Sequence, residues 1–83
     1  MDAIISQIKD DINDELHDVA KYIELYKTMH QRGFKRSEKI ISEIIKDEYS
    51  HAEALIELLE IENVNTEEYD RKLIGARKQI EEL

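Results

Sequence analysis

The stretch ISEIIKDEYSHAEALIEL, residues 41–58, decides how this chain is expected to fold. Its apolar residues recur in steps of three and four, which is the periodicity of one face of an α-helix. The resulting seam comprises Ile41, Ile44, Glu48, His51, Leu55 and Leu58. Glu48 and His51 therefore stand where the pattern requires apolar side chains. A buried carboxylate is normally paired, protonated or bound to a metal, because an unpaired one is costly to desolvate.

The segment before this stretch shows the same anomaly. A second seam with helical spacing has Glu15 at its centre and comprises Ile8, Ile12, Glu15, Val19, Tyr22 and Tyr26. Residues at i and i+3 are neighbours on a helix, so Glu48 and His51 can point at one metal ion. One Glu on one helix and a Glu-x-x-His on the next are half of a di-iron carboxylate site.

Composition indicates one small all-α domain. The 83 residues include no Cys, no Pro and only two Gly, and the charged 39% of the chain is placed periodically, which favours amphipathic helices over disorder. The net charge of −8 argues against binding to nucleic acid. No signal peptide and no membrane-spanning apolar run is visible, so we expect a cytoplasmic protein without membrane contact.

The first two helices are expected to form an antiparallel hairpin over residues 1–62. The first helix should run from Asp2 to Gln31 and end near Gly33, the natural left-handed cap. Ser37, followed by Glu38, is the expected start of the second helix. A short connection of this kind makes two helices antiparallel neighbours.

A third helix of the same domain is expected within residues 63–83. It should cover about residues 67–83, after a loose capping box formed by Asn65 and Glu68. The sequence leaves open whether this helix packs on its own hairpin or docks a protein partner.

One hairpin of amphipathic helices cannot close a core, whereas two copies can form a four-helix bundle. We therefore expect a homodimer, or a multiple of one, in which four carboxylates and two imidazoles surround two metal ions per dimer. This donor set suits iron, with manganese or zinc also possible. Counting from the turn, Glu15 and Glu48 are offset by roughly six residues, or ~9 Å of helix rise.

Glu15, Tyr22 and the segment from Asp47 to Glu53 together resemble the first half of the ferritin-like superfamily. The similarity covers roughly residues 8–62 and is greatest to rubrerythrins and encapsulated ferritins. It implies that Glu15, Glu48 and His51 ligate iron. It also implies that Tyr22 lies beside the metal and that Asp47 holds His51 in its tautomer.

The chain departs from this family in lacking a second Glu and a second Glu-x-x-His, so the resemblance implies a site completed by homodimerisation. It also lacks the linker and targeting tail of encapsulated ferritins, so residence in a protein shell is not predicted. Electron transfer of the rubrerythrin kind needs a cysteine-ligated centre. We therefore expect oxidation of ferrous iron by oxygen rather than peroxide reduction. No catalytic residue separate from the metal ligands and no other cofactor is expected.

Alternatives without catalysis stay open at this point. Glu15 could lie on a solvated face, and Glu48 with His51 could be a buried pair that orients a structural or interaction dimer without metal. In a third alternative the chain is a storage or adaptor subunit that binds a protein partner through residues 67–83.

Overall fold

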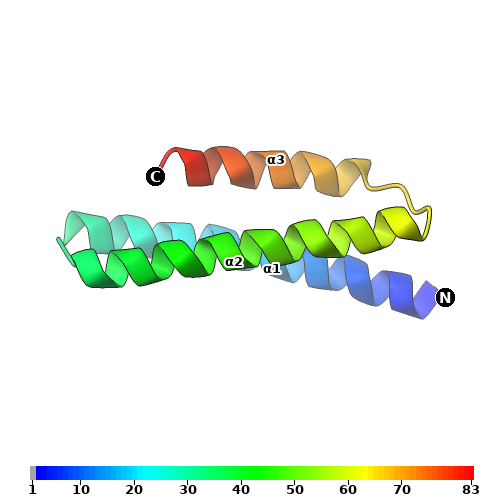
Figure 1. Cartoon of the computed structure of the whole chain (residues 1–83), viewed down its shortest axis with the longest axis horizontal. Coiled ribbons are helices and arrows are strands. Elements are labelled where there is room, and N and C mark those ends of the chain that lie inside the picture. The colour runs from blue at the N-terminus through cyan, green and yellow to red at the C-terminus, as the bar shows by residue number, and fades with distance from the viewer. Residues whose placement is uncertain (1) are drawn as a thin grey trace.

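The computed structural model describes residues 2–83, so the first residue of the expected domain lies outside it. This part of the chain forms three helices and no strand: α1 (Asp2–Gln31), α2 (Lys35–Ile61) and α3 (Glu67–Glu81). α1 and α2 form an antiparallel hairpin, and α3 runs back along it (Figure 1). Within residues 2–83, no helix combines the length and the apolar character needed to cross a membrane.

The turn between α1 and α2 confirms one expectation and corrects another. Gly33 has φ +74°, and the N–H groups of Gly33 and Phe34 bond back to the last carbonyls of α1, as expected for a left-handed cap. Ser37 is not the start of α2, which begins at Lys35 with Phe34 in the capping position. The Phe34 carbonyl already accepts the N–H of Glu38 at 2.9 Å, so Ser37 lies inside the first turn.

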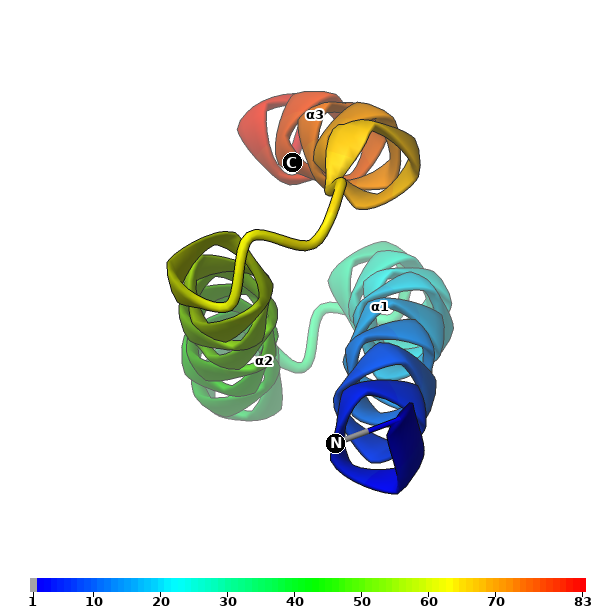
Figure 2. The ribbon, with the colours of Figure 1, turned by 90° about the vertical axis from the view of Figure 1, so that its right-hand side faces the viewer.

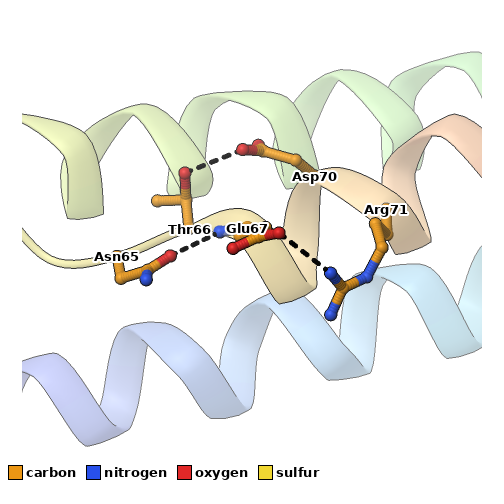
Figure 3. A network of polar contacts seen from close by, with 5 residues as sticks. All are labelled: Asn65, Thr66, Glu67, Asp70 and Arg71. Carbon is orange, nitrogen blue, oxygen red and sulfur yellow. Dashed lines mark hydrogen bonds and ion pairs between the residues drawn. The ribbon is translucent and has the colours of Figure 1, made fainter.

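The start of α3 forms the expected capping box only in part. The Asn65 side-chain oxygen accepts the Glu67 N–H at 2.9 Å, and Thr66 Oγ1 donates to Asp70 at 2.9 Å (Figure 3). Glu68 does not close the expected box, because its carboxylate pairs with Lys72 one turn further along α3. α2 and α3 each end slightly before the expected residues, at Ile61 and Glu81.

α3 packs on its own hairpin and covers one face of it. One cluster joins α3 to the open end of the hairpin through Tyr69, which packs with Ile12, Ile56 and Leu59. A second cluster lies nearer the turn, where Ala76 and Ile80 of α3 pack against the buried residues Val19, Ile23, Ile41 and Ile45. Viewed end-on, α3 lies over the groove between α1 and α2, and the opposite side of the hairpin is uncovered (Figure 2).

We call this uncovered side the open face. The grooves beside α3 are lined by one edge of each hairpin helix, including Leu16 and Ala20 of α1 and Lys46 and Tyr49 of α2. By helical periodicity the opposite edges form the open face. Its main residues are Ile4, Asp11, Glu15, Asp18, Tyr22, Leu25, Ile40, Ile44, Glu48, His51, Leu55 and Leu58.

The expected seam of α2 is therefore not the hairpin interior. The buried line of α2 is Ile41, Ile45, Ala52, Ile56 and Leu59, while Leu58 is 44% exposed and the His51 side chain is 60% exposed. α2 contacts both α1 and α3. The most buried residues of α2 face the space between α1 and α3. As a result, most residues of the expected seam lie at the edge of the open face.

Candidate metal centre

Glu15, Glu48 and His51 converge at the middle of the hairpin. Each offers one ligand atom, and these atoms lie within 4.8 Å of one another. His51 Nδ1 is 3.6 Å from Glu15 Oε2. The offset of roughly six residues expected between Glu15 and Glu48 does not keep their ligand atoms apart. Counted from Gly33, Glu15 lies 18 residues before it and Glu48 15 residues after it, while His51, 18 residues after it, is level with Glu15. Glu48 is one turn away on the same face of α2.

The two carboxyl groups have an unusual environment. Glu15 Oε2 is buried and has no hydrogen-bond partner among the described residues, although the side chain as a whole is 24% exposed. The pKa of Glu48 is raised to about 7, first by a hydrogen bond with the Glu15 carboxyl, then by burial and by the negative charges of Glu15 and Asp18. The charge of His51 acts in the opposite direction and lowers the pKa of Glu48, but it is the smallest of these effects. At neutral pH the metal-free pair therefore tends to hold a proton.

These residues fit a divalent cation. A partnerless buried carboxylate oxygen, a second carboxylate with an unfavourable charge and an imidazole within reach are the donors that iron, manganese and zinc accept. A cation would supply the positive charge that the pair lacks. Within residues 2–83, this cluster provides three donors, too few for two metal ions.

A hollow of about 430 Å³ opens beside this cluster on the open face. It is lined by Asp11, Asp14, Glu15, His51, Ala54 and Leu55. The acidic lining favours cations over anions. Asp11 is a lining residue that was not predicted from the sequence, although its spacing to Glu15 and Asp18, by four and then three residues, places all three on one face of α1.

Tyr22 and Asp47, the two residues expected to support the metal ligands, are not part of the cluster of Glu15, Glu48 and His51. Tyr22 is half-buried against the cluster that includes Val19 and Ile23, with Lys21 Nζ 4.9 Å from the centre of its ring. Asp47 is exposed. The roles of Tyr22 beside the metal and of Asp47 in orienting His51 stay predictions. Glu15 lies on the open face but is not a fully solvated residue, because one of its carboxylate oxygens is buried.

A second polar cluster, which the sequence did not predict, closes the hairpin at its turn. Tyr26 donates to Glu38 Oε1 at 3.1 Å, and His30 Nδ1 lies 3.0 Å from the same oxygen. The Tyr26 and His30 rings stack with centroids 6.2 Å apart. The hydrogen bond with His30 is the main cause that lowers the pKa of Glu38. This cluster ties the last turn of α1 to the first turn of α2.

The fold and the carboxylate–histidine cluster define a ferritin-like di-iron domain, a class that commonly binds iron. The family model named Rubrerythrin matches residues 8–81, a range that includes Glu15, Glu48 and His51. The chain therefore belongs to the rubrerythrin family. A search of the curated proteins and a search of the solved structures each found no match.

Proposed function

We propose that this chain is a homodimeric ferroxidase, a protein that oxidises ferrous iron with oxygen at a site shared by two copies. Glu15, Glu48 and His51 of each copy would hold two iron ions per dimer. The observation that carries the proposal is their convergence on the one face of the hairpin that α3 leaves uncovered. A second hairpin on that face doubles the donors to four carboxylates and two imidazoles, the ferritin-like set.

The position of the cluster along the hairpin supports this sharing. Glu15 is the fourteenth residue of the 30-residue α1, and Glu48 is the fourteenth of the 27-residue α2. A two-fold axis at this point overlays two hairpins along their full length. It would cover apolar side chains that one chain leaves in water, such as Ile40, 59% exposed, and Leu58.

The residues of the site have distinct roles in this proposal. Glu15 and Glu48 neutralise the cations, and Glu48 must first release the proton that Glu15 helps it to hold, because a ligand carboxylate has to be ionised. His51 donates a ring nitrogen, with Asp47 proposed to hold its tautomer and Tyr22 proposed to lie beside the metal. Iron bound there would supply the electrons that reduce oxygen.

Iron titration and oxidation test the proposal. We expect the purified protein to bind two ferrous ions per dimer and, in air, to produce a near-ultraviolet ferric band faster than buffer does. Glu48→Gln should lose both properties. Glu53→Gln is the matched control, since Glu53 lies exposed on the same helix outside the cluster. Oxidation no faster than in buffer, with no metal in the purified protein, would instead support a structural or interaction dimer.

A further inference from the structure

The hairpin turn carries local positive charge in a chain whose net charge is −8. Five of the twelve Lys and Arg residues form ion pairs among residues 2–83. Of the seven that do not, four lie within residues 32–39, and all four are exposed: Arg32, Lys35, Arg36 and Lys39. The turn lies at one end of the 47 Å long axis (Figure 1). We call residues 32–39 the basic tip.

The one acidic residue in this stretch does not neutralise its outer surface. The Glu38 side chain is only 18% exposed. Its Oε1 accepts the Tyr26 hydroxyl at 3.1 Å and lies 3.0 Å from His30 Nδ1, so the carboxylate is held against α1. In the part of the chain that the structure describes, the four cations of the basic tip pair with no carboxylate, and their charge stays available to an external anion.

An exposed aromatic side chain lies among these charges. Phe34 is 52% exposed and belongs to neither buried cluster. Its N–H donates to the Met29 carbonyl at 3.0 Å, and its carbonyl accepts the Glu38 N–H at 2.9 Å. Because the backbone is fixed on both sides, a partner could cover the ring without first ordering the turn. Aromatic and arginine side chains are also the residues that carry most binding energy in protein interfaces.

A hollow of about 340 Å³ opens beside the turn. Gly33, Lys35 and Lys39 line it together with Tyr26 and Ser42. Two ammonium groups at one recess suit a side-chain carboxylate, which a hydroxyl can also bind. Phe34 lies between two of the lining residues in the sequence, so the turn offers an anion site and an apolar site next to each other.

From the charge, the exposed ring and the hollow, we propose that the basic tip docks a short acidic segment of another protein, one that carries apolar side chains among its carboxylates. An apolar side chain of that segment covers Phe34, and a carboxylate enters the hollow beside Lys35 and Lys39. The recess favours a protein segment over a flat bilayer, because a protruding side chain can fill it. This docking is independent of the metal site, since Glu15 and His51 lie 18 residues from Gly33, ~27 Å along the helices.

Peptide binding to the full-length, metal-free protein tests this docking. The probe is a fluorescein-labelled peptide of roughly 12 residues, made of Glu with a Leu at every fourth position, and its counterpart has Ser in place of Leu. By fluorescence anisotropy at low salt, the protein should bind the Glu/Leu peptide saturably and about tenfold more tightly than the Glu/Ser peptide. Added salt should weaken the binding several-fold, because the charges are exposed.

Variants of the tip should lose this binding. Phe34→Ser should weaken it about tenfold, and so should the joint replacement of Lys35→Glu and Lys39→Glu, because the first removes the apolar contact and the second repels the peptide. Circular dichroism of each variant checks that the helices are kept.

Matched controls carry the same changes elsewhere on the surface. Ile74→Ser alters a side chain of α3 that is 56% exposed. Lys46→Glu with Lys78→Glu reverses two exposed lysines that, like those of the tip, form no ion pair among residues 2–83. Both controls should bind the Glu/Leu peptide within about twofold of the wild type. Equal losses in the tip and control variants, or no saturable binding by the wild type, would overturn the proposal.

A single fluorescent reporter separates the other occupants of the tip. The chain has no Trp, so Phe34→Trp places one at the tip, and its emission should shift to the blue with the Glu/Leu peptide. A shift with phosphatidylserine vesicles but not with the peptide would overturn the protein partner in favour of an anionic membrane. A lower solution mass of Phe34→Ser than of the wild type, by light scattering, would assign the tip to another copy of the chain instead.

Discussion

At the scale of single residues, the carboxyl groups of Glu15 and Glu48 repel each other when both are ionised. Two carboxyl groups near each other, one of them with a buried and partnerless oxygen, raise the free energy of the folded metal-free chain. The same arrangement lowers the free energy once a cation neutralises them. The site thus trades some stability of the metal-free protein for affinity toward metal.

The raised pKa of Glu48 predicts how stability depends on pH. Its carboxyl binds a proton more tightly in the folded chain, where the pKa is about 7, than in the unfolded chain, where it is near 4.5. The stabilisation from this proton is complete below pH 4.5 and is lost as the pH rises through 7. Denaturant unfolding of the metal-free protein should show this fall between pH 5 and 8. Glu48→Gln should remove that part of the slope, and an unchanged slope would contradict the assignment.

Replacing Glu48 separates a metal site from a structural pair. In the metal-free state Glu48→Gln should melt at or above the wild type, because it removes one of two repelling carboxylates. It should no longer gain stability from Fe²⁺ or Zn²⁺, whereas the wild type gains by mass action when the ligand binds only the folded state. If Glu48 instead serves to hold His51, the variant should lose ~1–3 kcal/mol without metal. Thermal melts of both proteins decide between these outcomes.

At the scale of the elements, Gly33 and Gly75 should have opposite effects on stability when they are replaced by alanine. Gly33 has φ +74° and allows the hairpin turn, while Gly75 lies inside α3 with open space where a Cβ would project. Gly33→Ala should destabilise the chain by ~1 kcal/mol, because a side chain disfavours the left-handed conformation. Gly75→Ala should stabilise it by a similar ~0.5–1 kcal/mol through helix propensity. Chemical denaturation of the pair checks both signs, and equal effects would refute the explanation.

The packing of α3 is tested by a core substitution. Leu59 is fully buried and packs with Tyr69 of α3, Ile12 of α1 and Ile56 of α2. Leu59→Ala should cost ~2–5 kcal/mol of stability, the range for a leucine truncated inside a core. Leu58→Ala, one residue earlier and 44% exposed, is the matched control. Similar losses measured by urea unfolding of dilute, metal-free protein would show that the buried line of α2 is misplaced.

At the scale of the whole molecule, the open face should decide the oligomeric state. Wild-type protein should give twice the chain mass of 9.8 kDa, or a multiple of that dimer, in light scattering at micromolar concentration. Leu58→Lys places a charge on the open face and should shift the protein toward monomer. Ile74→Lys on α3 should leave the dimer intact, although Ile74 is the more exposed of the two at 56%. A wild-type monomer, or equal effects of both substitutions, would refute dimerisation through this face.

The sequence by itself determined the helices and the candidate ligands, because both depend on local order. Apolar periodicity marked the three helical segments, and Gly33 marked the turn through its backbone freedom. The i, i+3 spacing of Glu48 and His51 is a property of any helix, so their shared direction needed no tertiary information. Glu15 was found in the same way, as a polar residue inside an apolar seam.

Only the tertiary structure decided which side of α2 is interior and how the helices are aligned. Periodicity gives the width of an apolar stripe but not its centre. α2 packs against both α1 and α3, and it buries Leu59 while Leu58 stays 44% exposed. Glu15 and His51 lie at the same height along the hairpin only because α2 begins at Lys35. That start is set by the Phe34 carbonyl, which accepts the N–H of Glu38, and not by Ser37. The Tyr26–His30–Glu38 cluster likewise needs the closed turn, because its residues come from two helices that meet only after folding.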